Sequence, residues 1–119
     1  MSRDSGRRID DILNAIDRCQ QYVRRLDDDA DDLVLMAEDA IERNLQMIGE
    51  AANHLPQHVR DAHPEIGWPQ IRGFRNILVH RYFGVEPEVV RDVVVTYLPP
   101  LAAALKTHTR GSNQDGAQG

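Results

Sequence analysis

The sequence predicts an all-α fold, a bundle of four to five helices. Apolar residues recur at spacings of three and four along most of the chain, which is the spacing of one face of a helix. Proline and glycine separate these periodic segments. Alternating strand patterns are lacking, apart from a β-branched stretch at Val93–Thr96. Amphipathic helices without a sheet must bury their apolar faces against one another, so we expect one helical core.

The first predicted helix runs from about Arg7 to Leu26, and the aspartates at 27–29 end it. Its apolar stripe includes Cys19, the only cysteine of the chain. A single cysteine forms neither an internal disulfide nor a cysteine zinc cluster, so we interpret Cys19 as a small core residue. The stripe consists of Ile9, Ile12, Leu13, Ile16, Cys19, Val23 and Leu26.

The second predicted helix runs from about Asp31 to His54, and Asp29 or Asp31 is the expected cap at its N-terminus. Gly49 stands in its middle, where glycine costs about 1 kcal/mol relative to alanine. A close approach of another helix would explain this glycine. The expected buried face comprises Leu33, Met36, Ala40, Ile41, Leu45, Ile48, Ala52 and Leu55.

Two further helices are predicted before residue 83. A short one spans Pro56 to Ala62. The next has Pro69 in its first turn, where the missing N–H is no loss, and runs to about His80 or Tyr82. Gly73 lies within this helix and is expected to loosen it.

The last predicted helix begins near Pro87, and Pro99-Pro100 should kink or split it. Residues 109–119 are rich in Gly, Ser, Gln and Asn, which predicts a disordered tail. We therefore expect one helical domain at residues 1–108 and a tail at 109–119.

Composition places the chain among ordinary globular proteins, with 41% hydrophobic and 28% charged residues. No apolar run approaches the roughly 20 residues that a membrane-spanning helix needs. The polar N-terminus lacks the apolar stretch of a signal peptide, so we expect a cytoplasmic protein without a membrane partner.

The charges are unevenly distributed along the chain. The net charge of −5 argues mildly against RNA binding, because phosphate contacts need lysine and arginine. Acidic residues concentrate between Asp27 and Glu50, whereas none occurs in residues 66–85, which contain Arg72, Arg75 and Arg81. One acidic and one locally basic region indicate two separate surfaces. Arg72 and Arg81 are accordingly candidate RNA-binding residues.

The basic segment contains the side chains that a metal-free RNA cleavage requires. Such a cleavage needs a base for the ribose 2′-hydroxyl, an acid for the leaving 5′-oxygen and a cation for the phosphate. His80 can act as base or acid near neutral pH, and Arg75 offers a fork that fits phosphate oxygens. Asn76 follows the arginine directly. An Arg and a His at this spacing are also common in helices without any function.

Helix geometry restricts this interpretation. Residues five apart on a regular helix are turned by roughly 140° from each other, so Arg75 and His80 do not share a face. Asn76 and His80 do share one, and Arg72 joins them. Either the helix ends or distorts before His80, or a second copy of the chain completes the site, and we favour the two-fold dimer.

His54, His58 and His63 raise the alternative of a metal site. Pro56 interrupts the first pair, and neither a cysteine nor a paired carboxylate joins them. We therefore expect neither a metal nor a cofactor.

Residues 75–82, Arg-Asn-Ile-Leu-Val-His-Arg-Tyr, resemble the Arg-x4-His-x-Tyr signature of HepT-type proteins in the HEPN superfamily. The resemblance extends from about Ile9 to Leu105. It includes the Leu-Gln and Ile-Gly-Glu-Ala motifs within 43–52, the approach to the signature in 55–74, and the segments 82–85 and 98–101.

This resemblance implies a HEPN-type homodimer or higher oligomer that acts as a metal-independent RNA endonuclease. Such proteins are the toxin of a type VII-like toxin–antitoxin pair, encoded beside a nucleotidyltransferase antitoxin of the MntA type. It further implies that Arg75 and His80 are the catalytic pair, that Asn76 supports them, and that Tyr82 is the position where the antitoxin attaches AMP. An amphipathic residue at a helix end is the alternative interpretation of Tyr82.

Two other hypotheses remain from the sequence. The chain could be a non-catalytic helical partner that presents Tyr82 or a substrate to a nucleotidyltransferase, or a plain structural dimer. Loss of toxicity on substitution of His80 would favour the nuclease over both.

Overall fold

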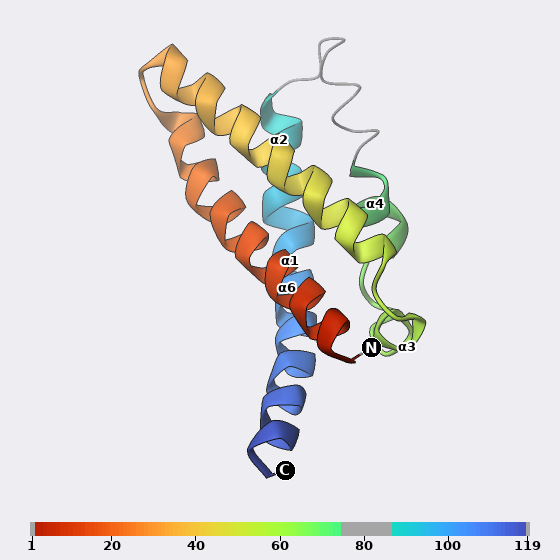
Figure 1. Ribbon diagram of the computed structural model, residues 1–119. Coiled ribbons are helices and arrows are strands. Elements are labelled where there is room, and N and C mark those ends of the chain that lie inside the picture. Colours follow the sequence, from red (N-terminus) through yellow and green to blue (C-terminus); the bar gives the residue numbers. More distant parts are fainter. Residues whose placement is uncertain (1, 75–86, 119) are drawn as a thin grey trace.

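The structure is a computed structural model that describes the backbone of residues 2–74 and 87–118 and the side chains of residues 6–74 and 88–108. Within these ranges the regular elements are all helices, so the predicted all-α fold is confirmed (Figure 1). The elements are α1 (Ser2–Tyr22), the 3-10 helix η1 (Val23–Asp27), α2 (Asp31–Asn53), α3 (Gln57–Asp61), α4 (Trp68–Arg72) and α6 (Pro87–Gln118).

The framework is a hairpin of α1 and α2, with η1 at its turn (Figure 1). The long helix α6 packs against α1 and also contacts α2, and its C-terminal part extends beyond the hairpin. α3 and α4 lie beside the C-terminal end of α2, and α4 packs on it.

One continuous core joins these helices. The predicted stripe of α1 is buried at Ile9, Ile12, Ile16 and Cys19, and Leu13 is partly buried. The core also takes residues from α2, α4, α6 and the connections. These include Ile41, Leu45, Ile48, Ala52, Leu55, Val59, Trp68, Ile71, Phe74, Val90, Val94, Leu98, Leu101 and Leu105.

Two residues that we expected on the buried face of α2 are exposed. Leu33 is 43% and Met36 is 64% exposed. Both lie in the first turns of α2, at the end of the hairpin that projects away from α3 and α4 (Figure 1). Helical periodicity identifies a face but not how far along the helix other elements cover it, so the prediction was wrong at this end.

The N-terminus of α2 also differs from the prediction. Its N-cap is Ala30, and no side chain caps it, so the expected cap by Asp29 or Asp31 was wrong. Asp28 Oδ1 instead accepts a hydrogen bond of 3.1 Å from the N–H of Ala30, one residue before the helix. Asp31 and Asp32 still lie in the first turn, where negative charge favours the helix dipole.

α6 is a single helix across Pro99 and Pro100, so the predicted split is absent. The two prolines remove the hydrogen bonds that the carbonyl groups of Val95 and Thr96 would accept. Both of these residues and both prolines are exposed, so water can satisfy the carbonyl groups. Leu98 and Leu101 are fully buried on either side and hold the helix against the core.

The helix also continues through Gln118, across the segment whose composition predicts disorder. Disorder of residues 109–119 in solution stays a prediction.

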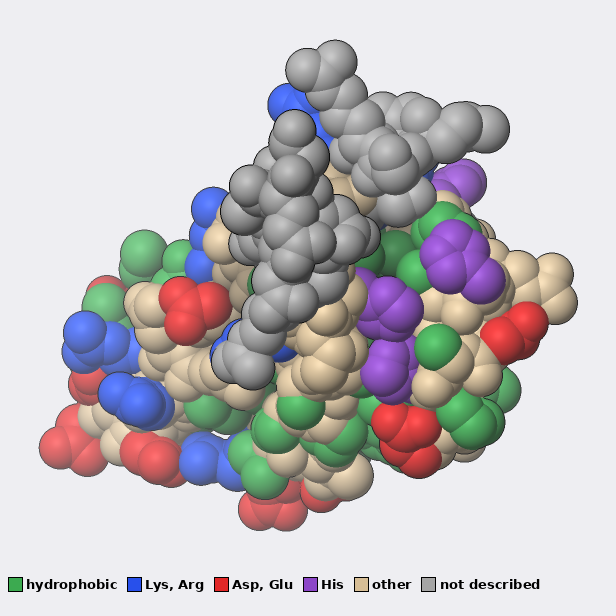
Figure 2. All heavy atoms as spheres, turned by 90° about the horizontal axis from the view of Figure 1, so that it is seen from below, with side chains coloured by type: hydrophobic (Ala, Val, Ile, Leu, Met, Phe, Trp, Pro, Cys, Tyr) green, Lys and Arg blue, Asp and Glu red, His purple; other side chains and the backbone are tan. Residues whose placement is uncertain are grey.

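A histidine pair connects the loop before α4 with α6. The Nε2 atoms of His63 and His108 are 2.9 Å apart, and the rings meet edge to face. Figure 2 shows the histidine side chains gathered on this face. Glu65 Oε2 lies 3.4 Å from Nδ1 of His63, which favours a proton there and leaves Nε2 to accept from His108. The contact is a hydrogen bond only when one of the two Nε2 atoms carries a proton.

This pair predicts that the fold weakens in mild acid. Burial, and then the charges of His63 and His58, lower the pKa of His108 below its ordinary value. A base whose pKa is lowered by folding contributes stability that is present above the unfolded pKa of about 6.5 and is lost as the pH falls through the folded value. The melting temperature should therefore fall by a few degrees between pH 7.5 and 5.5, and less so in His108→Asn, which keeps a donor for His63. His54→Asn, at an exposed histidine outside the pair, is the control. An identical acid response in His108→Asn and the wild type would contradict the prediction.

Candidate functional site

α4 leads directly into the signature segment. Pro69 lies in its first turn, as predicted. Trp68 is buried, and its Nε1 donates a hydrogen bond of 3.0 Å to the carbonyl oxygen of His63, so it anchors the entry to the helix. The helix ends at Arg72 with Gly73 as its C-cap, where the N–H of Gly73 bonds to the carbonyl groups of Pro69 and Gln70.

The predicted single helix from Pro69 to His80 is therefore interrupted at Gly73. Phe74 is again helical. Arg75, Asn76, His80, Arg81 and Tyr82 lie outside the described residues. Of the predicted site residues, the structure places Arg72.

Gly49 explains how closely α4 approaches α2. A Cβ atom at this position would lie 3.0 Å from the carbonyl oxygen of Ile71 and 3.8 Å from Cβ of Phe74. The first distance is too short for an ordinary side-chain contact with a backbone atom. The helix–helix approach inferred from the glycine is thus present, and the backbone of α4 rests directly on the backbone of α2.

Two further contacts fix the end of α4. Nε of Arg72 donates a hydrogen bond to Oδ1 of Asn53, the last residue of α2. Phe74 is fully buried, and its ring meets the ring of Tyr97 on α6 edge to face, with centroids 6.3 Å apart. Just before Arg75, therefore, Arg72 is held by α2 and Phe74 is held by α6.

The other end of the signature segment is attached near the turn of the hairpin. Arg91, in the second turn of α6, forms a two-pronged ion pair with Asp27 of η1, at 2.6 and 3.3 Å. The hydrogen bond and the charge of Arg91 lower the pKa of Asp27. Residues 75–86 thus connect Phe74, beside the C-terminal end of α2, with α6. The ion pair between Arg91 and Asp27 holds α6 to η1, at the turn of the hairpin.

Two buried polar side chains of α2 escaped the sequence analysis. Glu38 is 4% and Asn44 is 7% exposed. Nδ2 of Asn44 donates a hydrogen bond of 2.7 Å to the carbonyl oxygen of Ala40, one turn earlier, so this amide is engaged by its own helix. The helical spacing could have predicted that Glu38 is buried, because it follows the buried Ala37 and precedes the buried Ile41 by three residues. A single glutamate on a helix, however, is most often solvated.

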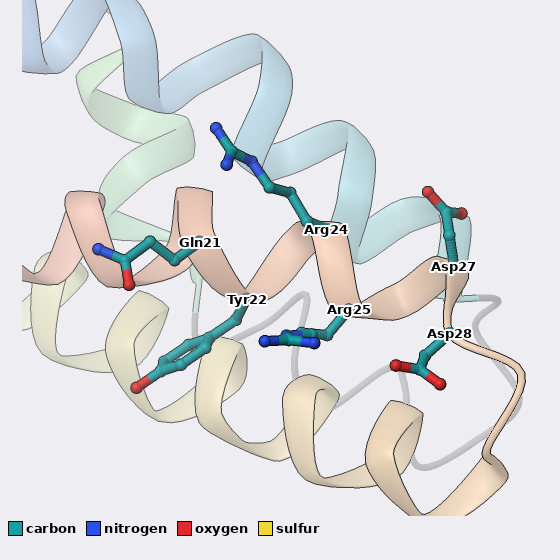
Figure 3. Close-up of a pocket in the computed structure, with 6 residues that line it drawn as sticks. All are labelled: Gln21, Tyr22, Arg24, Arg25, Asp27 and Asp28. Atoms are coloured by element: carbon teal, nitrogen blue, oxygen red, sulfur yellow. The ribbon is translucent and has the colours of Figure 1, made fainter.

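A surface hollow at the turn of the hairpin is lined by Gln21, Tyr22, Arg24, Arg25, Asp27 and Asp28 (Figure 3). Two arginines and two carboxylates line it, and Asp27 is paired with Arg91 of α6. Because Arg91 lies outside the hollow and neutralises Asp27, the hollow keeps two arginines against the single carboxylate of Asp28.

The described part of the chain holds neither a metal-binding cluster nor a thiol that ionises at neutral pH. Residues 2–74 and 87–118 contain no group of three or more His, Cys, Asp or Glu side chains that could hold a metal ion. Burial raises the pKa of the Cys19 thiol to about 12, so it is protonated at neutral pH and serves as a core residue, as predicted. Among the helices of the described residues, none has the length and apolar character needed to cross a bilayer.

Comparison with known proteins adds the decisive observation. Residues 12–108 match the family described as "Ribonuclease HepT-like". The chain belongs to the HepT-like ribonuclease family. The match begins within α1 and spans α2, α3, α4, the signature segment and α6 up to His108, so it covers most of the helical core described above.

Relatives of the chain carry ribonuclease names. The chain is 31% identical over 101 residues to the Thermococcus cleftensis protein named "Probable ribonuclease HepT", and the match covers 85% of this chain and 92% of the relative. It is 36% identical over 67 residues to a Caldanaerobacter subterraneus protein named as a putative RNase, covering 56% of this chain and 60% of that protein.

A third relative, from Methanocaldococcus jannaschii, is 30% identical over 101 residues and is named as a gamma-glutamylcyclotransferase and putative RNase. The match covers 85% of this chain but 46% of that protein. No solved structure was found to match the chain.

The close packing at Gly49 predicts a position-specific effect of added volume. Gly49→Ala should lower the free energy of unfolding by about 1 to 3 kcal/mol, because the new methyl group overpacks against the carbonyl of Ile71. Gly6→Ala is the matched control, since nothing lies within 4 Å of its added Cβ and alanine favours the helix. Urea denaturation measures both changes. A Gly49→Ala protein as stable as Gly6→Ala would contradict the close approach.

Proposed function

We propose that this chain is a metal-independent RNA endonuclease and the toxin of a type VII-like toxin–antitoxin pair. The observation that carries the proposal is the match to the HepT-like ribonuclease family, because it spans the segment with an intact Arg75-x4-His80-x-Tyr82 signature. The ribonuclease names of the relatives support the same activity.

In the proposed reaction, His80 takes up or donates a proton, and Arg75 binds the negatively charged phosphate. A base removes the proton of the ribose 2′-hydroxyl, and the 2′-oxygen attacks the adjacent phosphorus. The bond to the 5′-oxygen breaks, and an acid gives that oxygen its proton. The guanidinium of Arg75 stabilises the charge on the phosphate oxygens, and Asn76 supports the pair.

A homodimer would supply the acid and the base from two copies. If residues 75–80 form a regular helix, Arg75 and His80 do not share a face, and one copy does not aim both at one phosphate; a helix that ends or distorts before His80 is the alternative. Several large apolar side chains of α2 and α6 are exposed, namely Leu33, Leu35, Met36, Met47, Val89 and Val95.

The proposed regulator is a nucleotidyltransferase antitoxin of the MntA type that attaches AMP to Tyr82. Tyr82 lies two residues after His80 and next to Arg81 in a segment without acidic residues. An anionic adduct there would exclude RNA by its bulk and by repelling phosphate.

The nuclease proposal predicts cleavage of RNA in the presence of EDTA by unmodified protein. His80→Ala should reduce the rate by about 100- to 10,000-fold, because general acid–base catalysis typically contributes that much. Its fold, followed by circular dichroism, should be unchanged. Equal cleavage by both proteins would exclude His80 as the catalytic group. Absence of cleavage by either would favour the non-catalytic partner instead.

The modification proposal predicts a mass increase by one or more AMP units after co-expression with the nucleotidyltransferase. Tyr82→Phe removes the phenolic oxygen and should abolish the increase, whereas Tyr97→Phe, at a tyrosine on α6, should keep it. Intact-mass spectrometry decides this, and an unchanged gain in Tyr82→Phe would rule out the site.

A further inference from the structure

A second surface hollow lies between α3 and α4, at the end of the molecule from which the signature segment begins. It is lined by Gln57, Arg60, Asp61, Pro64, Trp68 and Arg72. Arg60 lies on α3 and Arg72 on the last turn of α4, so two short helices bring two guanidinium groups to one place. Figure 1 shows both helices beside the C-terminal end of α2.

Arg72 is held but not neutralised by its contact. Its Nε donates to the side-chain carbonyl of Asn53, which is an uncharged acceptor. This bond fixes the direction of the guanidinium while the positive charge stays available. No carboxylate of the described residues forms an ion pair with Arg72.

Arg60 is the less expected member of the pair. Its Nε is buried and has no hydrogen-bond partner among the described residues. A buried donor without an acceptor is unfavourable, and native proteins keep few of them. No described carboxylate forms an ion pair with Arg60 either, although Asp61 lines the same hollow. Arg60 therefore has no structural ion pair within the described residues to explain its position.

Two arginines and one carboxylate line this hollow. The hollow in Figure 3 has the same balance once Asp27 is paired with Arg91, but it lies at the turn of the hairpin, whereas α3 and α4 lie at the C-terminal end of α2. Planar guanidinium forks match phosphate oxygens in both geometry and charge. Arg72 also precedes Arg75 by three residues, and Phe74 between them is fixed in the core.

We propose that Arg60 and Arg72 form a phosphate subsite that holds single-stranded RNA beside the bond to be cleaved. This proposal rests on the proposed ribonuclease function, and it assigns a binding role to the surface between α3 and α4. Arg60 and Arg72 bind the backbone without reading the bases, so the subsite contributes affinity rather than sequence preference. Asp61 opposes the phosphate and limits this affinity.

The test is the binding of a 2′-O-methyl oligoribonucleotide, which lacks the free hydroxyl that cleavage requires. Fluorescence anisotropy at several salt concentrations gives the affinity and its salt dependence. Arg60→Gln and Arg72→Gln should each weaken binding by about 10- to 100-fold, because each removes a charged hydrogen bond. Each should also reduce the slope of log affinity against log salt by about 0.7. Asp61→Asn should strengthen binding.

Arg24→Gln is the matched control. It removes one positive charge from the hollow of Figure 3, so it changes the net charge equally without touching the proposed subsite. Its affinity should stay close to that of the wild type. An equal loss in Arg24→Gln and Arg60→Gln would show a general charge effect and overturn the subsite.

Unchanged affinity and salt slope in Arg60→Gln and Arg72→Gln would overturn the proposal as well. If Arg60→Gln fails to fold, Asp61→Asn decides, since unchanged binding in that variant contradicts the subsite. Loss of binding in the arginine variants of a protein that cleaves no RNA would support the subsite and refute the nuclease. The two proposals are therefore distinguished.

Discussion

The contact between the backbones of α2 and α4 at Gly49 is the constraint on which the candidate site depends. The carbonyl oxygen of Ile71 occupies the space that any side chain at residue 49 would need. With α4 this close, Ile71 and Phe74 are fully buried and Arg72 reaches Asn53. The chain therefore enters the signature segment from a point fixed by shape, by a hydrogen bond and by ring packing. A looser contact would leave that point undefined, whatever the sequence that follows it.

The fold also separates charges in a way that suits an acidic protein with an anionic substrate. Aspartate and glutamate are concentrated in residues 27–50, from the end of η1 through α2, and Asp27 is paired with Arg91 at the turn of the hairpin. Arg60 and Arg72, which have no ion pair among the described residues, both line the hollow between α3 and α4. A net charge of −5 is thus compatible with phosphate binding at one end of the molecule, because exposed charges separated by more than about 10 Å are largely screened.

The sequence was sufficient for the helices, and its failures have specific causes. The expected second helix, Asp31 to His54, agrees with α2 to one residue, since its apolar spacing is regular and both ends carry turn residues. The predicted N-cap of α2 was wrong because Ala30 takes this position through the local hydrogen bond to Asp28, which helix propensity does not reveal. The predicted burial of Leu33 and Met36 was wrong because tertiary packing decides how much of a helix face other elements cover. The prolines of α6 are tolerated because the carbonyl groups they leave free face water.

The candidate site, unlike the helices, could be predicted from the sequence only in part. The signature and the reason for Gly49 were both recognisable in the sequence, whereas Arg60 was not, because nothing local distinguishes it from any other arginine on a short helix. Its significance comes from the unpartnered Nε and from sharing a hollow with Arg72, twelve residues later in the chain. Such relations between segments exist only after the chain has folded.

The helix break at Gly73 bears on how Arg75 and His80 can act together. The break precedes both residues, so it sets the direction of the following segment without changing the angle between them. If that segment is a regular helix, the two side chains still diverge by roughly 140°, and a single copy cannot aim both at one phosphate. A two-fold axis beside the segment would bring Arg75 of one copy towards His80 of the other. For a regular helix the proposed chemistry therefore needs a second copy, whereas a helix that ends or distorts before His80 would let one copy supply both side chains.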